Sequence, residues 1–238
     1  MGLFKFRGFL PFILIIFINA LVDVGHKMVI QNTLYKSFSG DTLVVLTALV
    51  NLLILLPYAG MSSISGFLND KFSRVRVTRY AAMAEAALIA LVTICYFFGL
   101  FYIAFFLTLI LAVQSAIYSP AKLGMIKNMV GAKNLGAANG ISQAVSIVAI
   151  LLSTIGVSVI FENLCAKSDD VSEILQSVWI IGVLLFVLSV LETACSFFIP
   201  MQSASEPNAK FDKNKFIRLG YLRDNMSYIF SARTIWLC

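Results

Sequence analysis

Five polar or charged side chains recur at helical spacing inside the first long apolar stretch of the chain, residues 9–35. Steps of three or four residues place side chains on one face of a helix. The set comprises Asn19, Asp23, His26, Lys27 and Gln31. A charge at the centre of a bilayer costs about 2.5–3.5 kcal/mol even on insertion scales. We therefore expect these side chains to avoid lipid, either by lining a polar cavity or by fixing the helix to its neighbours.

Asp23 and Lys27 are four residues apart and can neutralise one another on a helix. Such a pair would lower the cost of burying either charge without removing it. His26 is the only histidine of the chain. A lone buried histidine serves either as a hydrogen-bonded structural residue or as a proton carrier, and the sequence leaves both roles open.

Further polar residues interrupt later apolar stretches. Asn139, Gln143 and Ser146 occupy positions i, i+4 and i+7 and predict a polar stripe, for a pathway or for hydrogen bonds between helices. Glu85 and Glu192 each lie about eight residues from one end of an apolar stretch, roughly 12 Å at 1.5 Å per residue. Each carboxylate could line a polar cavity or pair with Lys or Arg of a neighbouring helix.

Catalytic and metal-binding patterns do not occur in the sequence. The four cysteines form no CxxC pair, and none lies at ligand spacing from the histidine. No nucleophile–base set or phosphate-binding loop is present. We therefore expect no catalytic residue, no metal site and no cofactor, and a protein that is not itself an enzyme.

Six apolar stretches provide the elements that would position these residues. A helix needs roughly 20 apolar residues to cross a bilayer, and helices satisfy their own backbone there. The stretches lack the alternating pattern of membrane barrels. They cover residues 9–35, 43–68, 77–98, 101–126, 139–161 and 178–199. We predict an all-α membrane protein whose six transmembrane helices form two three-helix repeats within residues 1–200.

The basic residues predict how these helices are oriented. The chain carries a net charge of +6. With a cytoplasmic amino terminus, fifteen Lys and Arg residues fall in cytoplasmic segments, whereas only Lys36 and Lys167 fall in outer loops. Cytoplasmic loops are enriched in Lys and Arg. The pattern predicts that both termini are cytoplasmic and that the basic residues face anionic lipids rather than nucleic acid.

Residues 201–238 differ in character from the rest of the chain. Pro200 ends the last apolar stretch, and a polar, basic linker follows. Residues 216–230 are mildly amphipathic and predict either a helix on the membrane surface or a disordered tail. Six helices plus a cytoplasmic linker are half of the twelve-helix transporter plan. We therefore expect a chain truncated before a carboxy-terminal half.

Three segments resemble known membrane transporters. Residues 66–74 read GFLNDKFSR and resemble the inner-gate signature of the major facilitator superfamily. Residues 116–124 read AIYSPAKLG, are followed by ANG at 138–140, and resemble the lysophospholipid transporter family. Residues 19–33 resemble the first helix of family members fused to an acyltransferase and an acyl-acyl-carrier-protein ligase.

This resemblance implies half of a twelve-helix facilitator domain in the bacterial inner membrane. The family moves lysophospholipids from the outer to the inner leaflet for re-acylation. The implied partners are membrane lipids, a lysophospholipid substrate, the missing carboxy-terminal half and a fused or separately encoded acyltransferase or ligase. The expected substrate pathway comprises Asn19, Asp23, His26, Lys27, Tyr118, Asn139 and Gln143. The expected inner gate comprises Gly66, Asp70, Arg74, Arg76 and Lys122.

Two other interpretations stay open at this stage. The chain could anchor and dock a fused acyltransferase in the membrane without transporting lipid itself. It could also be a non-functional truncated fragment. Transport is favoured because a simple anchor does not need a buried aspartate such as Asp23.

Overall fold

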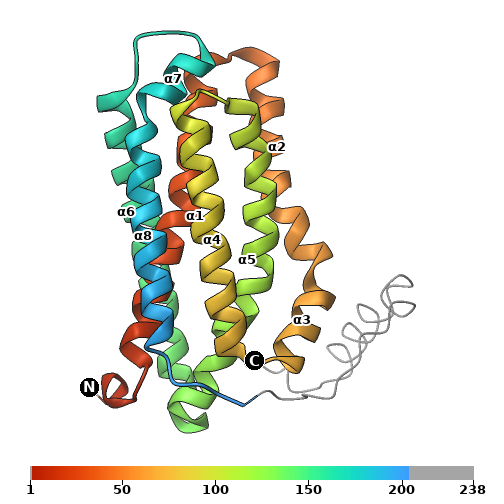
Figure 1. Ribbon diagram of the computed structural model, residues 1–238, viewed down its shortest axis with the longest axis vertical. Coiled ribbons are helices and arrows are strands. Elements are labelled where there is room, and N and C mark those ends of the chain that lie inside the picture. The colour runs from red at the N-terminus through yellow and green to blue at the C-terminus, as the bar shows by residue number, and fades with distance from the viewer. Residues whose placement is uncertain (1, 204–238) are drawn as a thin grey trace.

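The computed structural model describes residues 2–203, which form a bundle of α-helices (Figure 1). Six of the described helices are long and apolar enough to cross a membrane. They are α1 (Phe9–Ser37), α2 (Gly40–Gly60), α4 (Arg74–Phe97), α5 (Phe101–Val130), α6 (Leu135–Leu164) and α8 (Trp179–Phe197). The predicted all-α membrane fold is confirmed. The linker and surface helix expected within 201–238 lie outside the described residues, apart from 201–203.

Four short helical segments connect or extend the long helices. They are η1 (Leu3–Lys5), α3 (Ser62–Lys71), η2 (Ala132–Asn134) and α7 (Val171–Ser177). Because the chain crosses the bundle six times, residues 2 and 203 lie at the same end of it (Figure 1). We refer to this end as the basic end, since Arg74 and Arg76 begin α4 there and Lys127 lies in the last turn of α5.

The second apolar stretch differs from its prediction. The sequence predicts one helix over 43–68, followed by a loop that contains Gly66 and Asp70. The structure instead has two helices, α2 and α3, joined at Met61 shortly after Pro57. Proline and glycine weaken helices, and the Pro57–Gly60 segment is where the stretch divides. Gly66 and Asp70 therefore lie in a helix rather than in a loop.

Close helix packing in the core depends on two glycines. A Cβ atom on Gly25 of α1 would lie 2.6 Å from Cδ2 of Leu185 in α8. A Cβ atom on Gly182 of α8 would lie 3.1 Å from the Cα atom of Thr93 in α4. Small residues let membrane helices approach closely. Both α1 and α4 consequently pack tightly against α8.

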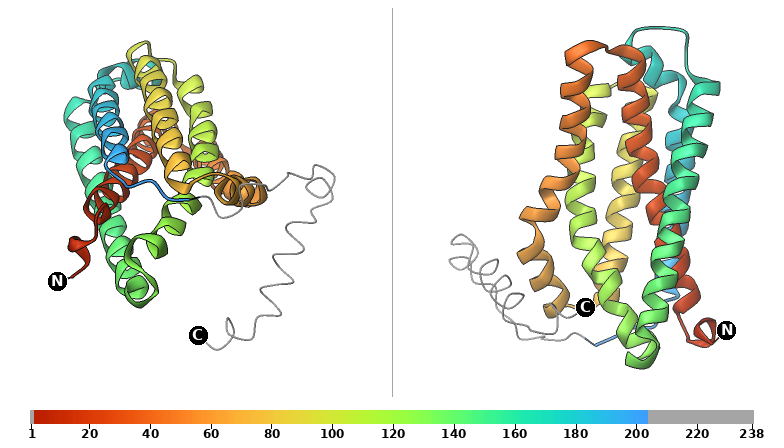
Figure 2. Two further views of the ribbon diagram at one scale, coloured as in Figure 1. Left: turned by 60° about the horizontal axis from the view of Figure 1, so that its bottom comes forward. Right: turned by 180° about the vertical axis from the view of Figure 1, so that it is seen from behind.

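The helices α2 and α6 are the least buried of the six. In the most apolar 18-residue segment of each helix, only 11% of the residues of α2 and 22% of those of α6 are buried. The corresponding share for α5 is 56%. Viewed from behind, α1 lies between α2 and α6 (Figure 2, right). Large apolar side chains such as Leu55 and Ile155 are exposed on these two helices. In a membrane, these faces contact either lipid or other membrane helices.

Candidate functional site

A network of polar side chains lies in the interior of the bundle, contributed by α1, α4, α5 and α8. Asn19 Nδ2 donates a hydrogen bond of 2.7 Å to Glu85 Oε2. Gln114 Nε2 donates to the same oxygen at 3.4 Å and to the Ala81 carbonyl at 2.9 Å. Asn19 and Gln114 are almost fully buried, and Glu85 is fully buried. Interhelical hydrogen bonds of this kind satisfy polar groups that lipid cannot.

Lys122 belongs to this network rather than to the inner gate. The sequence predicts Lys122 beside the other basic residues at the inner exit. In the structure only 9% of Lys122 is exposed, and its ammonium donates a hydrogen bond to Asn19 Oδ1. Its Nζ atom also lies 4.0 Å from the centre of the Tyr118 ring. This difference arises because the long lysine side chain turns into the bundle, where acceptor groups are available.

Asp23 does not form the predicted pair with Lys27. Both carboxylate oxygens of Asp23 instead accept from Ser115 Oγ of α5, at 3.2 and 3.1 Å. Within residues 2–203, the ion pair that forms is between Lys36 and Glu162. Asp23 nevertheless interacts electrostatically with Lys122. The direct contact of Asp23 is thus with Ser115 of α5 rather than with the lysine of its own helix.

Glu192 is buried near Glu85. Tyr118 OH donates a hydrogen bond of 2.6 Å to Glu192 Oε1. Neither carboxylate forms a direct ion pair with Lys or Arg among the described residues, although both interact electrostatically with Lys122. Glu85 and Glu192 lie in distant parts of the sequence, but in the structure they belong to one network that contains Lys122.

Two cavities adjoin this network. The larger, about 340 Å³, lies between α1, α2, α5 and α6, and its polar lining includes Asn19, Asp23, Tyr58, Lys122, Gln143 and Ser146. The smaller, about 210 Å³, is lined by Asp23, His26, Lys27, Tyr58, Thr108 and Ser115 among others. Asp23 and Tyr58 line both cavities. The structure thus brings Asn19, Asp23 and Gln143 together from two distant parts of the sequence.

His26 is held by hydroxyl groups of two neighbouring helices. Its Nδ1 atom lies 2.8 Å from Tyr96 OH of α4, and its Nε2 atom lies 3.0 Å from Thr108 Oγ1 of α5. The ring is 2% exposed and stacks near that of Tyr96. Because both ring nitrogens have partners, this arrangement favours the structural interpretation of His26.

The remaining predicted site residues lie nearer the basic end. Asn139 lines a groove with Arg74 and Lys127, and Gln143 lines both this groove and the larger cavity. Arg74 Nη1 donates a 2.7 Å hydrogen bond to the Gly124 carbonyl, and a Cβ on Gly124 would lie 2.7 Å from Arg74 Nε. Arg74 thus joins α4 to α5.

Two of the gate residues have no partner within this part of the chain. Asp70 is exposed and forms no hydrogen bond or ion pair with any described residue. Arg76 is also exposed and lines an apolar groove between α3, α4 and α5. The expected gate residues therefore do not form a single network with one another in residues 2–203.

Several site residues were not identified from the sequence. They are Tyr58, Tyr96, Thr108, Gln114 and Ser115. A signal was present within α5, where Thr108, Ser115, Tyr118 and Lys122 follow steps of seven, three and four residues. Such spacing places them along one face of a helix. Tyr58 has a comparable signal in α2, since it follows Thr47 and Asn51 at steps of four and seven residues.

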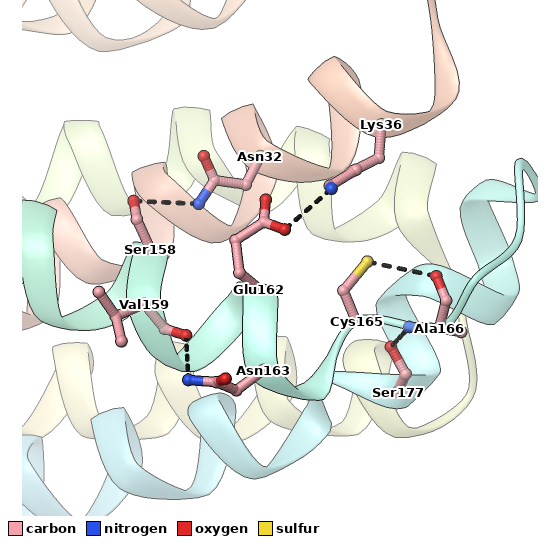
Figure 3. A network of polar contacts seen from close by, with 9 residues as sticks. All are labelled: Asn32, Lys36, Ser158, Val159, Glu162, Asn163, Cys165, Ala166 and Ser177. Carbon is pink, nitrogen blue, oxygen red and sulfur yellow. Dashed lines mark hydrogen bonds and ion pairs between the residues drawn. The ribbon is translucent and has the colours of Figure 1, made fainter.

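The opposite end of the bundle carries a second set of polar contacts between α1 and α6 (Figure 3). Lys36 Nζ lies 2.9 Å from Glu162 Oε2, and Asn32 Nδ2 donates to Ser158 Oγ at 3.2 Å. Exposed ion pairs contribute about 0.2–1 kcal/mol each. These contacts therefore join α1 to α6 without forming part of the buried network.

No protein-family model, curated protein or solved structure matches this chain. The class of protein is therefore defined by its fold and its buried polar network alone. It is an all-α, multi-pass membrane protein whose described helices bury Glu85, Glu192 and Lys122 and place Asp23 beside Lys122 in a cavity.

Proposed function

We propose that this chain is the amino-terminal half of a facilitator-type transporter that moves lysophospholipids from the outer to the inner leaflet of a bacterial inner membrane. The observation that carries this proposal is the cavity shared by Asp23 and Lys122. Ionisable residues inside a membrane protein are costly and commonly mark a substrate or ion pathway. A membrane anchor would not need them.

Opposite charges in one cavity match a zwitterionic lipid headgroup. Lys122 can receive a phosphate, and the Asp23 carboxylate can receive an ammonium group. Asn19, Gln143 and Ser146 add neutral hydrogen-bonding groups beside these charges. Apolar Ile16, Val24 and Ile150 line the rest of the cavity. This combination suits a lysophospholipid, whose headgroup is polar and whose single acyl chain is apolar.

The proposed function includes a second six-helix unit. The cavity lies between α2 and α6, which are the least buried helices. A partner seated on these faces would cover their apolar side chains and enclose the cavity from the other side. The basic end, with Arg74, Arg76 and Lys127, would face the cytoplasm according to the positive-inside rule. Re-acylation would then be carried out by a separate or fused enzyme.

Headgroup selectivity tests this proposal. We expect the purified full chain in nanodiscs to bind fluorescent lysophosphatidylethanolamine about tenfold or more tightly than lysophosphatidic acid of the same acyl chain. The reason is that only the former offers an ammonium group to Asp23, and a charge-assisted hydrogen bond contributes about 1.5–3 kcal/mol. Fluorescence anisotropy measures both affinities. Equal affinity for the two lipids, or no binding of either, would refute the headgroup assignment.

A further inference from the structure

Glu85 and Glu192 each keep one carboxylate oxygen without a partner. The satisfied oxygens are Glu85 Oε2, which accepts from Asn19, and Glu192 Oε1, which accepts from Tyr118. The other two, Glu85 Oε1 and Glu192 Oε2, are buried and have no hydrogen-bond partner among the described residues. Both side chains have 0% exposure. Water outside the bundle therefore does not reach them.

The two carboxyl groups belong to helices that pack against each other, α4 and α8. A chain of contacts through Asn19, Lys122 and Tyr118 links Glu85 to Glu192. The two carboxyl groups also interact electrostatically. An ionised carboxylate can only accept hydrogen bonds. Two ionised groups would therefore repel one another and leave two acceptors unsatisfied in a water-poor interior. A single proton shared by the two carboxyl groups would remove the repulsion and give both free oxygens a hydrogen-bond partner.

The surrounding charges also favour one proton shared by the two glutamates. Asp23 of α1 and Lys122 of α5 interact with both glutamates, and Tyr118 of α5 contacts Glu192. Cys195 of α8 also interacts with Glu192. Among the described residues, Lys122 is the cation that interacts with all three carboxylates. Even with Lys122 charged, three ionised carboxylates would leave two uncompensated negative charges.

We propose that Glu85 and Glu192 together form a proton-binding site, in which one proton joins Glu85 Oε1 to Glu192 Oε2. The pair is one carboxylic acid and one carboxylate. It connects α4 to α8 through a hydrogen bond that neither residue could form if both were ionised. Neither glutamate lines the proposed headgroup cavity, although Asn19 and Lys122 connect it to them. The proposal stands whether or not the chain transports lysophospholipids.

Infrared spectroscopy of the purified full chain in nanodiscs tests this proposal directly. At neutral pH, the wild-type protein should show the carbonyl stretch of a protonated carboxylic acid, with the shift that exchange into D₂O produces. Glu85→Gln and Glu192→Gln should each abolish that band, because the amide donates in place of the shared proton and the remaining carboxylate ionises. Asp23→Asn should retain the band.

The wild-type spectrum alone can overturn the proposal, so the test does not depend on the folding of any variant. Absence of a protonated carboxyl band at neutral pH would show that both glutamates are ionised. A band that persists in both glutamine variants would place the proton elsewhere. A band lost in Asp23→Asn but kept in the glutamate variants would assign the proton to Asp23.

Discussion

Replacing Lys122 by methionine should greatly reduce the amount of folded protein in the membrane. The side chain is buried beside Asn19, and its charge is shared by Asp23, Glu85 and Glu192. Removing one member of a buried charged group costs about 3–5 kcal/mol. This is a large fraction of the roughly 5–15 kcal/mol that stabilises a typical protein. Membrane abundance and thermal unfolding in detergent measure the effect.

Lys127→Met provides a matched control on the same helix, because Lys127 is exposed near the end of α5. It should leave abundance and unfolding temperature unchanged. The triple variant Lys122→Met, Glu85→Gln, Glu192→Gln should recover part of the lost stability, since it removes the charges that Lys122 balances. If Lys122→Met is as stable as Lys127→Met, Lys122 does not balance the buried carboxylates.

Asp23→Asn should abolish most binding of lysophosphatidylethanolamine while the protein remains folded. The asparagine side chain can still accept from Ser115, so the contact between α1 and α5 is retained. It cannot, however, balance the ammonium group of the headgroup. Loss of one charge-assisted hydrogen bond corresponds to about 1.5–3 kcal/mol, or at least about a tenfold weaker affinity. Fluorescence anisotropy in nanodiscs reports this change.

Asp41→Asn is the appropriate control for the Asp23 variant. Asp41 lies in the first turn of α2, outside both cavities described above. Its substitution should leave lipid affinity unchanged. Wild-type affinity in Asp23→Asn would reduce the role of Asp23 to packing between helices.

The helices of this protein could be predicted from its sequence to a large extent. Long apolar stretches and the requirement for backbone hydrogen bonds in lipid define six spans. The division of the second stretch into α2 and α3 was not predicted, although Pro57 and Gly60 provide the local cause. The sequence stays hydrophobic through this segment, so hydrophobicity does not show where the helix breaks. The position of the break depends on the backbone effects of Pro57 and Gly60.

The site could be predicted only in part. Polar residues in apolar stretches identified Asn19, Asp23, Glu85, Glu192 and Gln143. Their partners could not be assigned, because spacing along one helix favoured Asp23 with Lys27 whereas packing placed Ser115 beside Asp23. Lys122 was assigned to the basic end on its position in the sequence. The direction of a long side chain depends on its acceptors, and these come from other helices.

Transbilayer movement of fluorescent lysophosphatidylethanolamine tests the proposed transport most directly. The measurement uses liposomes that contain the full chain together with the carboxy-terminal six-helix half of a lysophospholipid transporter, and a membrane-impermeant quencher of the outer leaflet. We predict movement when both halves are present, little movement with either half alone, and loss of movement with Asp23→Asn. Robust movement by the monomeric chain alone, or none when the two halves are shown to associate, would contradict the half-transporter account.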